Sequence, residues 1–246
     1  DVAREELGED LGGARVLGIH LEGPYLSPEG RGAHQPGYLR APTIAEIDEL
    51  LEAGGGAGKM ITLAPELEGA MEATRYLTGR GVVASLGHST AGYEETLAAV
   101  DAGANHACHL FNCMPNLNKR EPGIAGALLA REEVFVELIA DGAHIHPFML
   151  AAAVKLKGAG RSVLISDAME AAGMPDGEYR LGAMEVTVRD GQARLKEGNL
   201  AGSTLALDRA VRNAVELMGV EVGEALAMAS RTPAESLGMK QAGRLT

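Results

Sequence analysis

The chain has 246 residues, of which 46% are apolar, and its formal net charge is −12. This length and apolar content allow one large α/β domain with a sizeable core. The charge is spread over short clusters without a block of lysine or arginine, which argues against nucleic acid as a partner. Two cysteines, Cys108 and Cys113, are too few for a disulfide framework, and no apolar stretch is long enough for a membrane span, so we expect a reducing, cytoplasmic setting.

Short apolar or β-branched runs alternate along the chain with longer segments of helical period, a pattern typical of repeated βα units with parallel strands. The expected strands are 15–22, 59–65, 81–88, 104–110, 134–141 and 161–167. The expected helices are 43–53, 68–78, 91–102, 147–156, 203–218 and 222–230. These elements predict an α/β fold, but the pattern leaves the strand order open, because six strands are too few for a closed eight-stranded barrel.

Local signals set some of the expected boundaries. Pro42 and Thr43 favour a helix start, and the glycines at 54–56 favour its end. After the sixth expected strand, the alternating run 183–189, the pair Asp190-Gly191 and the run 193–195 predict a β-hairpin. This hairpin interrupts the regular succession of strands and helices.

Titratable side chains fall at or just after the ends of the expected strands. They are Glu22, His88, His109, Asp141 and Asp167. The carboxyl ends of parallel strands meet at one edge, which is where α/β barrels place their active sites. We therefore expect these side chains to converge.

One glutamate and two histidines form a ligand set that suits Zn²⁺ or another divalent metal and leaves a position for water. Such a metal lowers the pKa of a bound water to about 7, and Asp167 could then move the proton to a leaving amine. A single histidine or aspartate at a strand end is usually structural, but several at successive strand ends favour a hydrolytic site. We interpret His20 and His106 as hydrogen-bonded interior residues and His146 as a loop or cap residue.

Seven motifs, in chain order, resemble those of the N-acetylglucosamine-6-phosphate deacetylases, a branch of the amidohydrolase superfamily. The motifs are HLEGPYLSPEGRGAH from His20, TLAPE from Thr62, SLGHSTAGYEET from Ser85, HLFNCMPNLNKREPGIAGA from His109, IADGAHIHP from Ile139, ISDAMEAAGMPDG from Ile165 and LAGSTLAL from Leu200. Together they cover essentially the whole chain. The combination of HLEGP with a following GAH is itself specific for this branch.

The resemblance implies that Glu22, His88 and His109 hold the catalytic metal and that Asp167 is the catalytic acid and base. His34 is similar to the residue that helps to polarise the acetamide carbonyl, where negative charge develops during attack. The implied cofactor is one divalent metal ion, with zinc expected first and iron or cobalt as alternatives.

The resemblance also implies a substrate site and a partner. Arg120 and His144 match the residues that bind the sugar 6-phosphate, and Arg120 is expected to reach the active site of a neighbouring subunit in a homodimer. Cys113 is not interpreted as a nucleophile, because no motif supplies a paired base. The expected substrate-binding residues are Ala33, His34, Asn112, Cys113, Arg120, Asp141, His144, Leu200, Ala201 and Gly202.

The fold implied by the resemblance is a (β/α)8 TIM barrel of the metal-dependent hydrolase type. The six expected strands would be its third to eighth, so residues 1–246 are predicted to form a single incomplete barrel domain that lacks the first two strands and a small β-domain. The implied reaction converts N-acetylglucosamine 6-phosphate to glucosamine 6-phosphate and acetate. Two alternatives stay open: deacetylation of the galactosamine epimer, and a non-catalytic fragment that binds metal.

Overall fold

A parallel sheet forms the centre of the computed structural model, which describes residues 16–239 and 241–244. Its six strands are β1 (Ile19–Glu22), β2 (Gly58–Leu63), β3 (Val83–Leu86), β4 (His106–Ala107), β5 (Phe135–Ile139) and β6 (Ser162–Ile165). Each strand pairs in parallel with the next one along the chain. This sequential order is that of a (β/α)8 barrel, because the strand order of a doubly wound sheet reverses direction. The sheet is therefore an arc of such a barrel.

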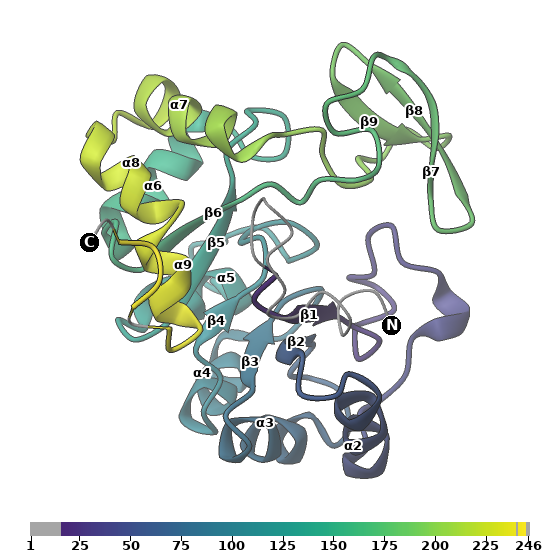
Figure 1. Cartoon of the computed structure of the whole chain (residues 1–246). Helices are drawn as coiled ribbons and strands as arrows, with labels where there is room; N and C mark the ends of the chain where they lie inside the picture. Colours follow the sequence, from purple (N-terminus) through teal and green to yellow (C-terminus); the bar gives the residue numbers. More distant parts are fainter. Residues whose placement is uncertain (1–15, 240, 245–246) are drawn as a thin grey trace.

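Helices follow the strands and cover the outer side of the curved sheet (Figure 1). They are α2 (Ile44–Ala53), α3 (Ala70–Gly79), α4 (Tyr93–Asp101), α5 (Gly123–Ala130), α6 (Pro147–Lys157), α7 (Leu207–Met218), α8 (Val222–Met228) and α9 (Arg231–Ser236), while the 3-10 turn η1 (Pro36–Tyr38) lies in the loop between β1 and α2. The last three contact β6. In the part of the chain that the structure describes, no helix has the length and apolarity needed to cross a membrane.

The core lies between the sheet and its helices. Every residue of β5 is buried, and β2 is buried from Met60 to Leu63. Such continuous burial is expected for parallel strands, which are covered on both faces. The charged exception in β5 is Glu137, which is 5% exposed.

The predicted elements are confirmed in kind and order, but most of the strands are shorter than predicted, and Arg15, the first residue of the predicted strand 15–22, lies outside the described residues. Residues 104–110 were predicted as a strand, yet only His106–Ala107 pairs with its neighbours, because the chain turns away from the sheet towards His109. Helix α5 was missed, since its sequence GIAGALLA is apolar all round and has no amphipathic period. The short helix α9 was missed as well.

The predicted hairpin is part of a larger element. Strands β8 (Met184–Arg189) and β9 (Gln192–Leu195) form it, and a third strand that was not predicted, β7 (Gly177–Leu181), pairs antiparallel with β8. This small sheet stands apart from the barrel arc (Figure 1). Its core joins Val186, Val188 and Ala193 to the segment after β6 and to the 200–202 loop through Met169, Ala171 and Ala201. The sheet is thereby anchored beside the carboxyl end of β6.

The N-terminal boundary of α2 depends on a capping hydrogen bond that can be tested by mutation. The hydroxyl of Thr43 accepts the backbone N–H of Glu46 at 3.3 Å. Replacing Thr43→Ala removes this cap and should lower the free energy of unfolding by about 1 kcal/mol, which is a fall of about 2–4 °C in Tm for a chain of this size. Thr43→Ser keeps the hydroxyl and should stay close to the unchanged protein in thermal and urea unfolding. Equal losses in both variants would contradict the capping role.

Candidate metal centre and active site

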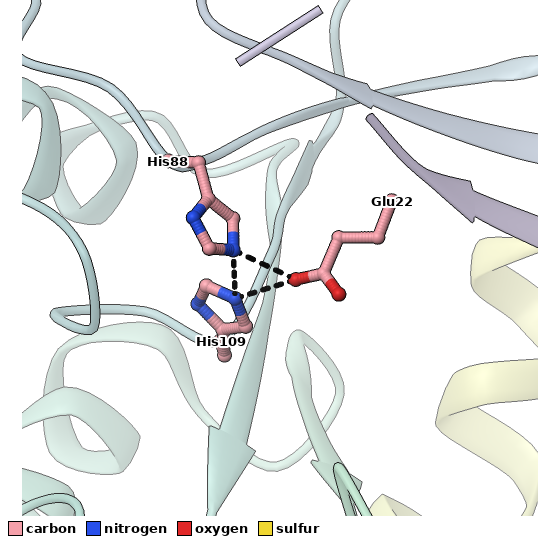
Figure 2. Close-up of side chains that lie close together, drawn as sticks. All are labelled: Glu22, His88 and His109. Carbon is pink, nitrogen blue, oxygen red and sulfur yellow. Dashed lines mark hydrogen bonds and ion pairs between the residues drawn. The ribbon is translucent and has the colours of Figure 1, made fainter. Parts of the chain in front are cut away.

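Three side chains from separate strand ends meet at one point (Figure 2). Glu22 is the last residue of β1, while His88 and His109 each lie two residues beyond the end of β3 and β4. The Glu22 Oε1 atom lies 2.9 Å from His88 Nε2 and 2.7 Å from His109 Nε2, and the two Nε2 atoms are 2.9 Å apart. The convergence expected from strand ends is therefore present.

The hydrogen bonds of His88 fit a metal ligand. Its Nδ1 lies 2.8 Å from the carbonyl oxygen of Gly30. A carbonyl can only accept, so Nδ1 carries a proton and donates to it, which leaves Nε2, facing Glu22 and His109, as the nitrogen that would bind a metal in place of a proton. A hydrogen bond of this kind on the far nitrogen is the usual way in which proteins orient a metal-binding imidazole.

The electrostatics of the cluster also fit a cation. Burial alone would raise the pKa of Glu22, but contacts with His109, His34 and His88 hold that pKa far below its ordinary value. Burial lowers the pKa of His88, yet contacts with Cys113 and Glu22 outweigh it and raise the pKa to about 10. The three side chains thus favour positive charge where they meet, as a divalent metal would supply.

Positive φ angles recur at the residues that aim side chains into the site. His88 has φ 47°, His109 has φ 23° and Asp167 has φ 50°. Residues other than glycine adopt this region at a cost on the order of 1–3 kcal/mol, and such residues concentrate at functional sites. Each of the three follows a strand, so the left-handed turn redirects the chain at the point where a site residue is needed.

Two more predicted residues lie beside the cluster. The imidazole of His34 stands edge-on to that of His88, with ring centroids 4.8 Å apart, and its Nε2 lies 3.8 Å from Glu22 Oε2. Burial raises the pKa of Asp167, and the positive charge of His109 opposes that rise. A carboxylate whose pKa is raised in this way is suited to taking up a proton.

These side chains line one cleft of about 880 Å³, which is large enough for a phosphorylated sugar. Glu22, His88, His109 and Asp167 line it together with His34. Further lining comes from the loop 32–38 and from the small sheet, at 181–184, Arg194 and 198–200. The cleft therefore lies between the barrel arc and the small sheet.

Six of the other predicted substrate residues also line the cleft: Ala33, Asn112, Cys113, His144, Leu200 and Gly202. Three do not lie among its described lining residues. Asp141 instead holds His144, with 2.6 Å between Asp141 Oδ2 and His144 Nδ1. Ala201 is buried in the core of the small sheet, and Arg120 is exposed in the loop before α5. Within this chain, then, Arg120 is not brought to the metal cluster.

The remaining histidines test the sequence interpretation. His106 is buried and hydrogen-bonded to Glu137 at 3.0 Å, and His146 caps α6 by accepting the N–H of Phe148, so both predictions are confirmed. The prediction for His20 is wrong in one respect. Its Nε2 bonds to Thr62 Oγ1 at 2.7 Å, but the residue is exposed because β1 is an edge strand of the described sheet.

Sequence reasoning missed three polar residues near the site. Glu66 accepts hydrogen bonds from the Ser89 hydroxyl and the Thr90 N–H, each at 2.6 Å, and so fixes the loop after His88. Arg194 is the one arginine or lysine among the described residues that line the cleft. Burial would raise the pKa of Glu137, but hydrogen bonding by His106 lowers it to about 2. The sequence did contain a signal for Glu137, because a charged residue inside the apolar run VFVELIA indicates a buried carboxylate with a partner.

Comparison with known proteins gives consistent relatives. The chain is 48% identical over 227 residues to the N-acetylgalactosamine-6-phosphate deacetylase of Escherichia coli O157:H7, covering 92% of this chain and 60% of that protein. It is 43% identical over 232 residues to the N-acetylglucosamine-6-phosphate deacetylase of Vibrio furnissii, covering 94% of this chain and 58% of that protein. The chain thus spans about 60% of the length of these curated relatives.

Solved structures agree with the barrel assignment. A variant of the N-acetyl-D-glucosamine-6-phosphate deacetylase of Mycobacterium smegmatis, in complex with N-acetyl-D-glucosamine-6-phosphate, matches with a TM-score of 0.88 and 44% identity, over 92% of this chain and 61% of that one. The N-acetylglucosamine-6-phosphate deacetylase of Pasteurella multocida matches with a TM-score of 0.91 and 33% identity, over 100% of this chain and 64% of that one. These proteins share the fold of the described chain.

Residues 3–246 match the amidohydrolase family. That match covers nearly the entire chain, and it agrees with the sequential parallel sheet and with the Glu22, His88 and His109 cluster at its edge. The chain belongs to the amidohydrolase family.

Proposed function

We propose that this protein hydrolyses the acetamide bond of N-acetylglucosamine 6-phosphate, giving glucosamine 6-phosphate and acetate. The observation that carries the proposal is the meeting of Glu22 Oε1, His88 Nε2 and His109 Nε2 in a cleft that Asp167 and His34 also line. The relatives named above for this reaction are longer chains, so their activity supports the proposal for this protein without establishing it.

The proposed metal ligands are Glu22, His88 and His109. A divalent metal held there supplies Lewis acidity, which makes hydroxide available near neutral pH and polarises an amide carbonyl. Zinc is the proposed ion because mixed histidine and carboxylate sets with an open position are typical of catalytic zinc, while iron and cobalt accept the same ligands.

The proposed proton path runs through Asp167. A C–O bond forms between water and the acetyl carbon, the C–N bond breaks, and the proton released by water passes through the Asp167 carboxylate to the departing amine. His34, beside Glu22, is proposed to donate a hydrogen bond to the carbonyl oxygen as negative charge develops on it. The raised pKa of Asp167 helps it hold the proton between the two steps.

The proposed substrate contacts extend beyond the reacting atoms. His144, fixed by Asp141, lines the cleft and could bind the 6-phosphate. Arg120 is proposed to reach the same phosphate in the cleft of a partner subunit, which fits its exposed position away from the cleft of its own chain. The homodimer that this requires and a cytoplasmic setting are part of the proposal.

A second substrate is favoured by a specific observation. The relative that is 48% identical carries the name of an N-acetylgalactosamine-6-phosphate deacetylase. The two sugars differ in the configuration of one hydroxyl, and the same metal cluster and Asp167 would serve either. Acetate release from both sugar phosphates, compared by kcat/KM, decides between them. A protein that binds metal and releases acetate from neither would instead be a non-catalytic metal-binding fragment.

The metal site has a direct test. His88→Ala removes one of the three proposed ligands and should reduce bound zinc from about one equivalent to a small fraction of that, measured by elemental analysis after dialysis. His146→Ala, which changes an exposed histidine at the start of α6, should leave the zinc content unchanged. Full zinc retention in His88→Ala would exclude that histidine as a ligand.

The proposed role of Asp167 predicts that its replacement lowers the rate of the reaction without lowering the amount of bound metal. Asp167→Asn should lower kcat by about 10²–10⁴, the range for loss of a general acid and base, while zinc content stays near normal. Asparagine tolerates the positive φ of this position. Asp190→Asn, at a turn with φ 52°, is the matched control and should keep full activity. Loss of zinc in Asp167→Asn would mean that the carboxylate is a ligand instead.

The role of Arg120 predicts a substrate-dependent effect. Arg120→Gln should raise KM for the sugar 6-phosphate by about tenfold or more, in keeping with the loss of one charge-assisted contact. KM for unphosphorylated N-acetylglucosamine should change little. Lys119→Gln, the neighbouring exposed cation, controls for general electrostatic attraction. A similar rise of KM for both sugars would exclude Arg120 as a phosphate ligand.

A further inference from the structure

A buried carboxylate lies next to the candidate metal cluster without lining the large cleft. Glu137 is 5% exposed and belongs to β5, where its neighbours in sequence are apolar. An ionised carboxylate without partners is costly to bury, so such residues persist only where hydrogen bonds satisfy them. The partners of Glu137 therefore indicate what it does.

The side-chain hydrogen-bond partners of Glu137 lie on the segment that carries His109, and its backbone carbonyl contacts the same segment. The Glu137 Oε2 atom accepts the backbone N–H of His109 at 3.1 Å, and the Glu137 carbonyl oxygen accepts the N–H of Leu110 at 2.9 Å. The Oε1 atom accepts from His106 Nε2 at 3.0 Å, and His106 is itself 1% exposed. One side chain thus holds both the strand β4 and the turn that follows it.

The two proposed histidine ligands differ in how their rings are held. The Nδ1 atom of His88 donates to the Gly30 carbonyl, which fixes its ring directly. The Nδ1 atom of His109 is buried and has no hydrogen-bond partner among the described residues. The direction of the His109 ring is therefore set by its packing against His88 and by its backbone, which has a positive φ of 23°, and not by a hydrogen bond at Nδ1.

Hydrogen bonds hold that backbone on both sides. The N–H of His109 is held by the Glu137 carboxylate, and its carbonyl oxygen accepts the side-chain amide of Asn112 at 3.1 Å. Asn112 was predicted as a substrate contact, whereas Glu137 lies outside the large cleft and lines a separate cavity of about 360 Å³ beside Glu22 and His109. Without the Glu137 contact, the buried N–H of His109 would lose its acceptor, and the strained backbone turn at His109 would relax.

We propose that Glu137 is a positioning residue that fixes the backbone of His109 so that its Nε2 atom stays directed at Glu22 and His88. This inference rests on the proposed metal centre and assigns Glu137 no contact with substrate. His106 serves the arrangement by satisfying the second carboxylate oxygen. The buried pair of Glu137 and His106 thus fixes the backbone of a proposed metal ligand from outside the large cleft.

The test compares zinc affinity in three variants of the protein, measured by competition with a chromogenic chelator at a temperature where all are folded. Glu137→Leu removes the acceptor and should weaken zinc binding by about 10–100-fold, the range found when partners that orient metal ligands are removed. In Glu137→Gln the amide oxygen can still accept from His109, so affinity should stay within about threefold. Leu138→Ala, at the next position of the same buried strand, should lose stability without a comparable loss of zinc affinity.

Each outcome decides the inference. It is overturned if Glu137→Leu binds zinc as well as Leu138→Ala does, or if Glu137→Gln is as weak as Glu137→Leu. If Glu137→Leu does not fold, the double variant with His106→Leu removes both members of the pair, leaves no charge unmatched, and is judged by the same affinity criterion. A wild-type protein that binds zinc but releases no acetate contradicts the proposed reaction and leaves this test valid. A wild-type protein that binds no zinc overturns both proposals.

Discussion

The convergence of one carboxylate and two imidazoles, Glu22, His88 and His109, is the constraint on which the rest of the site depends. These residues are far apart in sequence, and the sequential parallel order of β1 to β4 brings Glu22 Oε1 and the two Nε2 atoms within 2.9 Å of one another. Because every strand of that sheet runs the same way, each carboxyl end delivers its residue to the same edge. The fold and the proposed chemistry therefore share one geometric cause.

Polar groups concentrated at this edge are held by hydrogen bonds from neighbouring loops and from β5. The Gly30 carbonyl orients His88, Glu66 ties down the loop after it, and Glu137 holds the backbone of His109. Each contact satisfies a polar group that burial would otherwise leave costly. The positive φ angles at His88, His109 and Asp167 add strain that the same hydrogen bonds and the packed strands offset. Stability elsewhere in the barrel arc thus maintains a cluster that is unfavourable by itself.

The sequence was most informative where chemistry and periodicity coincide. Strand-end positions alone predicted Glu22, His88, His109, Asp141 and Asp167 as a group, and all but Asp141, which holds His144 instead, line the cleft. Motif resemblance added His34, whose place in a loop follows no periodic rule. Three features escaped: β7, although its side chains alternate between exposed and partly buried; α5, which has no amphipathic period; and the bond from the backbone N–H of His109 to Glu137, which no side-chain pattern encodes. Such contacts depend on how strands stack in space, which local sequence does not specify.

The site also divides its tasks between rigid and variable elements. The proposed metal ligands and Asp167 lie at or just beyond the ends of barrel strands, whereas the opposite side of the cleft consists of the loop 32–38, the small sheet and the loop at 198–200. Loops tolerate substitution better than packed strands do, so substrate preference can change while the proposed metal ligands and Asp167 stay fixed; His34 is the one proposed reacting group that lies in a loop. Relatives named for the glucosamine and for the galactosamine sugar are 43% and 48% identical to this chain. The fold is shared with relatives of known structure, so under the proposed function discrimination between the two sugars would arise from cleft residues that contact the hydroxyl in which they differ.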